Sequence, residues 1–353
     1  MRTGFRLLGI LLAAVLTVVP GFAAENVPTP LHNAILIGWD GVQRDHLKEC
    51  LGRDELPHLK QLIAEGAIMA IDVTTGATDT KAGWAQILTG YNPERTGVFS
   101  NSRYQPIPEG YTIFERLQAA FGRENIVTVM LAGKSNNLGA RGPHTIAPTR
   151  AAQAARTAAA EADMEKHEIT EVKPTAAPKQ STSGGLAGEP YFITHRKLDV
   201  FENGLGAADN VGNRALSFLE KYRDRRFFFF IHFQEPDPEG HRAGENSREY
   251  NDAIITDDLW LGRIVAKLKQ LNLYDRTRIY VVSDHGFDEG QKTHRHAPHV
   301  FLATNDPEVA AAGDRKDVVP TILWRFGVVL DQIQPPLDGK PLRRTATGGA
   351  PIW

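Results

Sequence analysis

The chain alternates short, continuously apolar runs with longer stretches of helical periodicity, and this alternation limits the folds open to it. Residues 34–39 form an apolar run that ends at Asp40, and residues 226–233 contain four consecutive phenylalanines. A strand that is apolar on both faces must be covered on both faces, as in the parallel sheets of α/β proteins. We therefore predict an α/β fold with a mostly parallel central sheet and helices on both faces.

The same patterns predict the individual elements. Leucines at helical spacing and a terminal glycine indicate a helix over residues 56–66, and Pro320 suits the first turn of another. The expected strands are residues 34–39, 67–73, 125–131, 226–233, 278–283 and 299–303. The expected helices are residues 56–66, 81–88, 111–121, 213–222, 248–271 and 317–326.

The N-terminus has the three parts of a secretory signal peptide. A basic lead with Arg2 and Arg6 precedes an apolar run over residues 7–19, and small residues follow. The apolar run is shorter than the roughly 18 residues that a membrane span requires, and no later run reaches that length. We predict a signal peptide over residues 1–24, a secreted or periplasmic protein, and no membrane span after cleavage. An uncleaved anchor is the alternative.

Composition excludes several classes of protein. Lysine and arginine together number 40 against 42 aspartates and glutamates, so no nucleic-acid-binding surface is indicated. The single cysteine, Cys50, excludes an intramolecular disulfide and a cysteine-based zinc cluster. The apolar fraction of 42% and the charged fraction of 23% are typical of a globular protein. Composition leaves the oligomeric state open.

One region interrupts the alternation of strands and helices. Residues 133–206 are rich in alanine, threonine, glycine, proline and lysine. Residues 151–164 have the composition of an alanine-rich helix, whereas residues 172–188 have little apolar surface to bury. We predict one catalytic domain over residues 25–345 that carries this region as an insertion, and a tail over residues 346–353. The insertion is either a lid or an excursion without function.

Three acidic residues lie at or just beyond the ends of predicted strands: Asp40, Asp237 and Asp284. Ligands of open α/β sheets bind outside the carboxyl ends of the strands. Three carboxylates gathered there would repel one another unless cations neutralised them. Any one of these residues alone is better explained as a turn or cap residue, so the metal interpretation depends on their joint placement.

Histidines accompany these carboxylates. Mixed carboxylate and imidazole ligands suit Zn²⁺ or Mn²⁺ better than Ca²⁺. Six such ligands are enough for a pair of metal ions about 4 Å apart. We therefore predict two divalent metal ions, zinc or manganese. The candidate histidines are His241, His285, His294, His296 and His299.

Thr80 stands at the start of a predicted helix that stops by Gly90. There its hydroxyl would share the site with free backbone N–H groups, which attract anions such as phosphate. A threonine hydroxyl becomes a nucleophile only when a base or metal ion activates it. The local sequence by itself favours a simpler role, in which Thr80 caps the helix.

Five motifs follow one another along the chain. They are Ile37-Gly38-Trp39-Asp40-Gly41, Thr80 ten residues before Gly90, Pro236-Asp237-Pro238-Glu239-Gly240-His241, Ser283-Asp284-His285-Gly286, and residues 317–323 with Leu337-Asp338-Gly339-Lys340. In this order they resemble the alkaline phosphatase superfamily, most closely its type I phosphodiesterase/nucleotide pyrophosphatase branch. The resemblance runs from residue 34 to about residue 342, apart from the insertion. It implies an alkaline-phosphatase-like, sulfatase-like fold.

The resemblance also implies two groups of metal ligands. One ion would be held by Asp40, Thr80, Asp284 and His285, and the other by Asp237, His241 and a third histidine. His294 is our choice for the third histidine, because His294-Arg295-His296-Ala297-Pro298 fits a His-x-x-x-Pro pattern of related members. His296 is the alternative, whereas His299 begins a predicted strand and is expected to be structural.

The resemblance further implies a covalent mechanism. Thr80 would attack phosphorus in line, and water would hydrolyse the resulting phosphothreonine. Asn101 falls where the branch has an asparagine that touches a phosphoryl oxygen. Sulfatases need cysteine or serine at the nucleophile position, so Thr80 indicates sulfatase-like ancestry without sulfatase activity. The Phe-Pro-Asn-His that usually follows the nucleophile of the branch is missing, so nucleotide specificity is left open.

We expect an exported two-metal hydrolase of small phosphorylated substrates, with diesters preferred over monoesters. Asn101 offers a neutral donor to the phosphoryl group, and a neutral donor favours the less charged diester. Lys81 and Lys134 are interpreted as a solvent-facing charge and a loop charge; either would reverse this preference by reaching the site. The alternatives are a phosphomonoesterase, phosphonate hydrolase or sulfatase-like esterase, and a catalytically inactive metal-stabilised binding protein.

Overall fold

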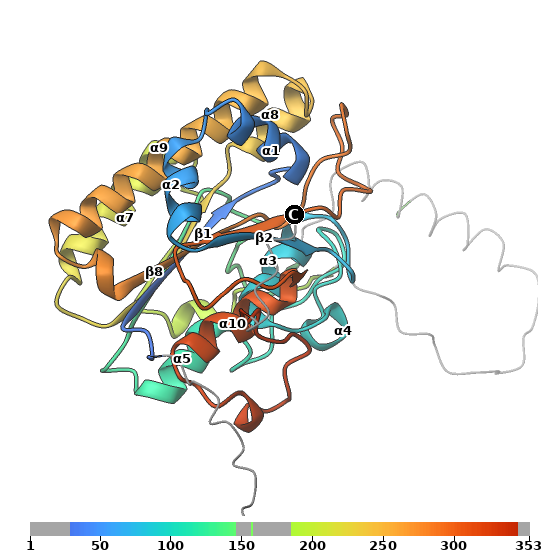
Figure 1. Cartoon of the computed structure of the whole chain (residues 1–353). Coiled ribbons are helices and arrows are strands. Elements are labelled where there is room, and N and C mark those ends of the chain that lie inside the picture. The colour runs from blue at the N-terminus through green and yellow to red at the C-terminus, as the bar shows by residue number, and fades with distance from the viewer. Residues whose placement is uncertain (1–28, 146–156, 158–184, 345–353) are drawn as a thin grey trace, which may run out of the picture.

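The computed structural model describes residues 29–145, 157 and 185–344 (Figure 1). The predicted signal peptide, the C-terminal tail and nearly all of residues 151–164 lie outside the described residues. Among the helices that the structure describes, none has the length and apolar character needed to cross a membrane.

The main sheet has eight strands. They are β1 (Asn33–Trp39), β2 (Ala67–Asp72), β3 (Val127–Ala132), β6 (Val200–Glu202), β7 (Phe227–Phe233), β8 (Thr277–Val282), β9 (Phe301–Thr304) and β10 (Gly313–Asp314). Their order across the sheet is β10-β2-β9-β8-β1-β7-β3-β6. Strand β9 runs antiparallel to its neighbours β2 and β8, and the other pairings are parallel. The predicted mostly parallel sheet is therefore confirmed.

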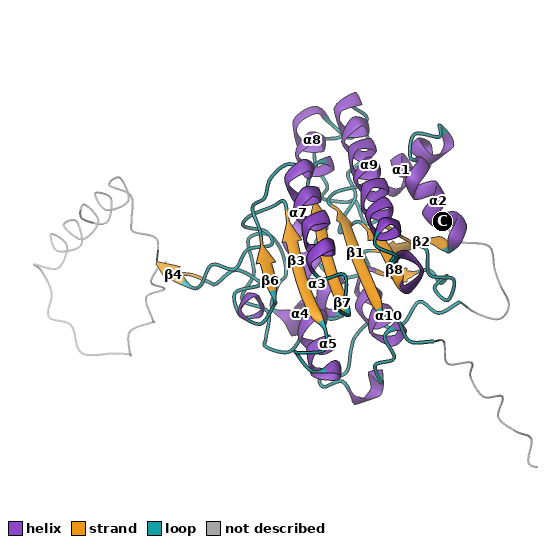
Figure 2. Ribbon diagram, turned by 90° about the vertical axis from the view of Figure 1, so that its left-hand side faces the viewer, coloured by secondary structure: helices purple, strands orange, loops and turns teal. Residues whose placement is uncertain are grey.

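Helices cover both faces of this sheet, as Figure 2 shows. One face carries α1 (Arg44–Gly52), α2 (Pro57–Glu65), α7 (Ala208–Lys221) and α9 (Arg248–Gln270). The other carries α3 (Thr80–Thr89), α5 (Ile113–Phe121) and α10 (Val318–Arg325). The remaining elements of the described residues are α4 (Pro93–Thr96), α8 (Pro236–Ala243), the 3₁₀ turns Thr194–Arg196, Tyr274–Arg276, Arg315–Asp317 and Leu330–Gln332, and a two-stranded antiparallel sheet of β4 (His144–Thr145) and β5 (Gly185–Leu186).

The core consists of two apolar clusters separated by the sheet. Successive side chains of a strand point to opposite faces, so a strand that is apolar throughout supplies both clusters. In β1, Ile35 and Ile37 belong to the cluster under α9, whereas Leu36 belongs to the cluster under α3. This two-sided burial is the physical reason for the continuous apolar runs in the sequence.

The structure departs from the predicted elements in a few places. The predicted strand over residues 299–303 is displaced to Phe301–Thr304, and His299 instead turns towards Asp72, 3.3 Å away. Strand β6 pairs with β3 although it lies within the predicted insertion. Helix α1 was not predicted, because its buried side combines Leu47 and Cys50 with the polar His46.

Candidate active site

Four strands bring charged residues to one edge of the sheet. Asp40 directly follows β1, Asp284 lies two residues beyond β8, and Lys134 lies two residues beyond β3. Asp237 is in the first turn of α8, shortly after β7 ends. Because β8, β1, β7 and β3 are adjacent and parallel, their carboxyl ends meet, and these side chains gather there.

Helix α3 brings Thr80 to the same edge. Asp79 caps this helix, and its carboxylate accepts a hydrogen bond from the backbone N–H of Ala82 at 3.3 Å. The backbone N–H of Lys81 donates to Asn101 Oδ1 at 2.9 Å. The predicted capping role of Thr80 is therefore wrong, and so is the expectation that these N–H groups are free. The Thr80 hydroxyl instead lies 3.5 Å from His285 Nε2.

A glycine in α3 allows this close approach. A Cβ added to Gly83 would lie 2.6 Å from the Cβ of Asp284, closer than side chains pack. The helix can therefore rest directly on the residue that follows β8. This contact sets the distance between Thr80 and the carboxylates of the sheet edge.

The first group of candidate metal ligands is fully buried. Asp40, Asp284 and His285 each offer one ligand atom, and these atoms lie within 4.8 Å of one another. His285 Nε2 is 3.7 Å from Asp40 Oδ1 and 3.6 Å from Asp284 Oδ2. The Thr80 hydroxyl borders this group, as the expected ligand set requires.

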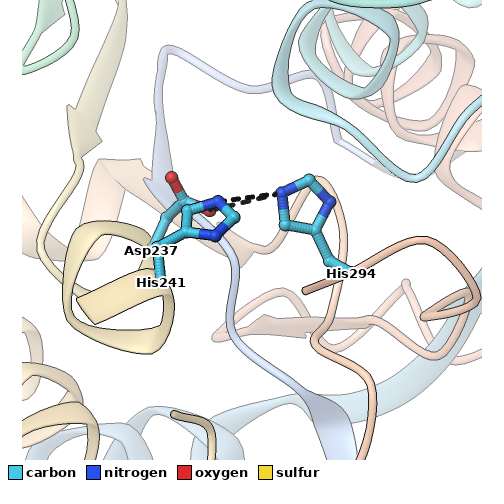
Figure 3. Close-up of side chains that lie close together, drawn as sticks. All are labelled: Asp237, His241 and His294. Carbon is cyan, nitrogen blue, oxygen red and sulfur yellow. Dashed lines mark hydrogen bonds and ion pairs between the residues drawn. The ribbon is translucent and has the colours of Figure 1, made fainter. Parts of the chain in front are cut away.

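The second group is more exposed than the first, and its three side chains lie close together in Figure 3. Asp237, His241 and His294 offer ligand atoms within 4.8 Å of one another. Asp237 Oδ1 is 3.4 Å from His241 Nε2 and 3.8 Å from His294 Nε2. The structure brings His294 into this group, whereas the backbone N–H of His296 bonds to Asp288 outside it.

In each of the three candidate histidines, one ring nitrogen is hydrogen-bonded and the other faces the other candidate ligands. His241 Nδ1 is 2.9 Å from the carbonyl of Lys292, and His285 Nδ1 is 2.9 Å from that of Gly286. His294 Nδ1 is 2.5 Å from the carbonyl of Thr78. A carbonyl only accepts, so Nδ1 carries the proton and Nε2 of a neutral ring has a free lone pair. Burial lowers the pKa of His285, and burial with the nearby His285 lowers the pKa of His294 to about 4.

These atoms fit divalent cations. The Nε2 atoms of His241 and His294 are 3.1 Å apart, close enough to share a proton or to face one metal ion together. Asp237 Oδ1 and Asp284 Oδ2 are buried without a hydrogen-bond partner among the described residues. Buried polar atoms rarely lack partners, so each oxygen is available as a ligand. Histidine and carboxylate together suit zinc.

Lys134 is part of the site, which corrects its interpretation as a loop charge. Its ammonium donates to Asp40 Oδ1 at 2.7 Å, to Asp237 Oδ2 at 2.6 Å and to Thr80 Oγ1 at 3.0 Å. Burial would lower the pKa of Lys134, but the charges of Asp40 and Asp237 outweigh it and raise that pKa. The ammonium therefore places a positive charge between the two groups.

Two further polar residues hold Asp40. His232, inside β7, donates to Asp40 Oδ2 at 2.7 Å, and the indole N–H of Trp84 donates to the same oxygen at 3.0 Å. Both side chains are fully buried. Such partners orient a metal ligand and leave its other oxygen to face the centre. A lone histidine within an apolar strand carries no motif, so sequence analysis did not single out His232.

A buried arginine holds the elements behind the site together. Arg315 is fully buried and donates to the backbone carbonyls of Asp284 at 2.9 Å and Ala77 at 2.8 Å. It therefore joins the end of β8 to the loop that leads into Thr80. Burial lowers the pKa of Arg315 to about 10, so the guanidinium remains charged at neutral pH. No local pattern in the sequence indicates this role.

The second group and Thr80 line a polar cavity of about 340 Å³, whereas the first group lies buried outside its lining. Asn101 lines this cavity. The expectation that Lys81 faces solvent is wrong, because Lys81 is buried and its ammonium lies 4.4 Å over the ring of Tyr104. The described residues that line the cavity all have polar side chains. They are Thr80, Asn101, Lys134, Ser135, Asn136, Asn137, Gln234, Asp237, His241 and His294.

Comparison with known proteins gives one family and a shared fold. A family model described as type I phosphodiesterase / nucleotide pyrophosphatase matches residues 34–334. The bis(5'-adenosyl)-triphosphatase enpp4 of Mus musculus is 25% identical over 280 residues, which cover 78% of this chain and 51% of the relative. This chain spans about half the length of that relative.

Two solved structures are similar to this one. The phosphonate monoester hydrolase SpPMH from Silicibacter pomeroyi superposes with a TM-score of 0.51 at 16% identity, covering 88% of this chain and 75% of that one. The lipoteichoic acid synthase LtaP from Listeria monocytogenes superposes with a TM-score of 0.52 at 14% identity, with coverage of 88% and 75%. At these identities the likeness establishes the fold alone.

Proposed function

Because this chain belongs to the type I phosphodiesterase / nucleotide pyrophosphatase family, we propose that it hydrolyses phosphoric diesters with Thr80 as the covalent nucleophile. Membership confirms the resemblance drawn from the five motifs, and the solved structures confirm the alkaline-phosphatase-like fold. The observation that carries the proposal is the placement of the Thr80 hydroxyl beside two groups of carboxylate and imidazole ligands.

The two groups would hold divalent metal ions, with zinc favoured over manganese because each combines histidine with carboxylate. Bound there, the ions would supply positive charge that stabilises the charge developing on the transferred phosphoryl group. The ligands would be Asp40, Thr80, Asp284 and His285 for one ion, and Asp237, His241 and His294 for the other.

The remaining residues of the site orient the reactants. Lys134 donates to one lone pair of Thr80 Oγ1 and thereby limits the directions in which the hydroxyl can attack. Asn101 Oδ1 accepts from the backbone N–H of Lys81, so its Nδ2 is left to donate to a phosphoryl oxygen in the cavity. A preorganised donor of this kind stabilises charge in the transition state.

The charge of the site does not favour diesters. Asn101 is a neutral donor, but Lys134 places a cation 3.0 Å from Thr80 Oγ1. The preference for diesters is therefore supported by the family and no longer by the charge of the site. A phosphomonoesterase is the second candidate, because a charged donor favours the more highly charged substrate.

Steady-state kinetics on metal-loaded protein test this function. We expect a higher kcat/KM for bis-p-nitrophenyl phosphate than for p-nitrophenyl phosphate. Thr80→Ala should abolish turnover, and Thr80→Ser should retain a measurable fraction of it because the hydroxyl is kept. Thr89→Ala, at the other end of α3, controls for loss of a buried threonine.

Each outcome discriminates between the candidates. A clear preference for the monoester would assign the chain as a phosphatase. Near-normal turnover by Thr80→Ala would exclude Thr80 as the nucleophile. If no ester is hydrolysed although metal is bound, the chain is a metal-stabilised binding protein instead of an enzyme.

We also propose that the protein is exported to the periplasm or the cell exterior and acts there on small phosphorylated substrates. The basic lead, apolar run and small residues of 1–24 support this localisation. Expression of the full chain in an exporting bacterium, followed by mass spectrometry, should give a mature protein that starts at Ala24 or Glu25. A retained N-terminus would instead support the uncleaved anchor.

A further inference from the structure

The Lys134 ammonium uses all of its hydrogen-bonding capacity inside the candidate metal centre. An ammonium has three N–H donors, and Lys134 donates to three oxygens: Asp40 Oδ1, Asp237 Oδ2 and Thr80 Oγ1. Its side chain is only 13% exposed. The cation is therefore held by the same residues that would hold metal ions.

The two ligand groups are affected unequally by this cation. In the first group, Lys134 occupies Asp40 Oδ1, the oxygen that His232 and Trp84 leave free, together with the Thr80 hydroxyl. In the second group, Lys134 contacts Asp237 Oδ2, whereas Asp237 Oδ1 faces His241 and His294 without a hydrogen bond among the described residues. The second group is thus ready for a cation, whereas the first offers Asp284 Oδ2 but has Asp40 Oδ1 and the Thr80 hydroxyl occupied by the ammonium.

We propose that Lys134 makes the two groups bind divalent cations in a fixed order and with unequal affinity. The group of Asp237, His241 and His294 fills first and tightly. The group of Asp40, Thr80, Asp284 and His285 fills second and weakly, because the ammonium must first leave Asp40 and Thr80. This inference rests on the proposed function of both groups as metal sites.

The charges of the centre support this order. A carboxylate must lose its proton to hold a metal ion, so Asp40, Asp237 and Asp284 as ligands carry three negative charges. One divalent ion and the Lys134 ammonium neutralise these charges together. A second divalent ion adds two uncompensated positive charges, so repulsion weakens its binding while the ammonium stays in place. Like charges at such distances inside a protein interact strongly.

The ammonium can leave without a change in the fold. The backbone carbonyl of Lys134 accepts a hydrogen bond from Gly204 N at 3.1 Å, which holds the main chain. The side chain lines the polar cavity, so rotation of its torsions moves the ammonium into that space. In the singly loaded protein, Lys134 therefore remains the cation next to Thr80.

Zinc titration of chelator-stripped protein tests the proposal. Calorimetry in the presence of a competing chelator should resolve a tight and a weak class of site in the wild type. In Lys134→Met, which keeps an unbranched side chain one atom shorter and removes the charge, the weak class should tighten by roughly tenfold to a hundredfold. This is the scale on which groups beside metal ligands change affinity. The tight class should change much less.

Control variants assign the two classes. Lys134→Arg keeps the charge and should keep the two classes apart. Lys81→Met removes a neighbouring lysine that lies over Tyr104 and should leave both zinc affinities unchanged. His241→Ala should remove the tight class, and Asp284→Asn should remove the weak class. Thermal unfolding checks that each variant is folded, and Lys134→Gln replaces Lys134→Met if the latter is not.

The outcomes separate this inference from the proposed function. Two equally tight classes in the wild type, or zinc affinities that are unchanged in a folded Lys134→Met, would overturn the role of Lys134 and leave the metal centre standing. Loss of the weak class in place of the tight one in His241→Ala would reverse the order and also overturn it. Absence of any zinc binding by the wild type would contradict the proposed metal centre itself.

Discussion

At the scale of single residues, the site depends on which atoms of each side chain are already bonded. Asp40 Oδ2 is taken by His232 and Trp84, so Oδ1 faces the centre. The Nδ1 atoms of the three candidate histidines are taken by carbonyls, so their Nε2 atoms face it. The groups that hydrogen-bond to one atom of each ligand thus decide which other atom is free for a cation.

In Asn101, too, the hydrogen bonds of one side-chain atom leave the other free, and this leads to a testable prediction. Its Oδ1 accepts from Lys81 N at 2.9 Å and from Asn137 Nδ2 at 3.3 Å, which leaves Nδ2 to donate into the cavity. We expect Asn101→Ala to lower kcat/KM for the diester by roughly tenfold to a thousandfold, the scale of losing one such donor. Steady-state kinetics measure this effect.

Asn125→Ala is the matched control, because Asn125 precedes β3 at the opposite edge of the sheet. It should leave kcat/KM unchanged. If Asn101→Ala were equally active, Asn101 would only cap the start of α3, and its amide would have no role in the reaction.

At the scale of elements, helix α9 illustrates how adjacent acids take different roles. Asp258 accepts hydrogen bonds from His58 N at 3.1 Å and Leu59 N at 2.7 Å, at the start of α2. It satisfies N–H groups that the N-cap residue of α2, Leu56, cannot satisfy. Asp257 is fully buried, and its two carboxylate oxygens have no hydrogen-bond partner among the described residues.

Asp257 therefore gives a prediction for stability against pH. Burial, followed by the charge of Glu235, raises the pKa of Asp257 well above its ordinary value of 3.8. Below pH 3.8 the group is protonated in both the folded and the unfolded chain. As the pH rises, only the unfolded chain releases this proton readily, so the free energy of unfolding falls. Asp257→Asn removes this titration and should be progressively more stable than the wild type at higher pH.

Urea unfolding of both proteins between pH 4 and pH 8 measures the difference. Asp252→Asn is the control, because it removes a carboxylate from the exposed side of the same helix. Its stability difference from the wild type should not grow with pH in the same way. A difference for Asp257→Asn that is independent of pH would contradict a buried, neutral Asp257.

At the scale of the whole molecule, one sheet carries both apolar clusters, so neither layer can separate without exposing the strands. Phe229 and Phe230 are neighbours in β7, and both are fully buried. Phe229 packs into the cluster under α7 and α9, whereas Phe230 packs into the cluster under α3, with its ring centroid 5.2 Å from that of Trp84. Substitutions at these two adjacent residues therefore test the packing on opposite faces of the sheet.

We expect Phe229→Ala and Phe230→Ala each to lower the free energy of unfolding by about 3–5 kcal/mol, because each leaves a large cavity. Both should shift a single unfolding transition, seen alike by far-ultraviolet and near-ultraviolet circular dichroism. Leu259→Ala, at a side chain that is 48% exposed, should change stability little. Separate transitions in either phenylalanine variant would show that the two layers unfold independently.

The local sequence by itself determined most of the sheet and the chemical types of the site residues. A strand that is buried on both faces must be apolar throughout, so β1, β7 and β8 are visible as runs within a few residues of their observed bounds. The motifs around Asp40, Asp237 and Asp284 are equally local, because each lies close to the end of a strand.

The tertiary structure alone decided which atoms meet. Lys134 follows β3, and no pattern around it indicates that β3 lies next to β7 and one strand away from β1. That order brings its ammonium to Asp40 and Asp237, which are 94 and 103 residues away in the chain. His232 and Arg315 likewise acquire their roles from partners distant in sequence. Strand order is set by long-range packing, so local periodicity could not place these cations and hydrogen bonds at the centre.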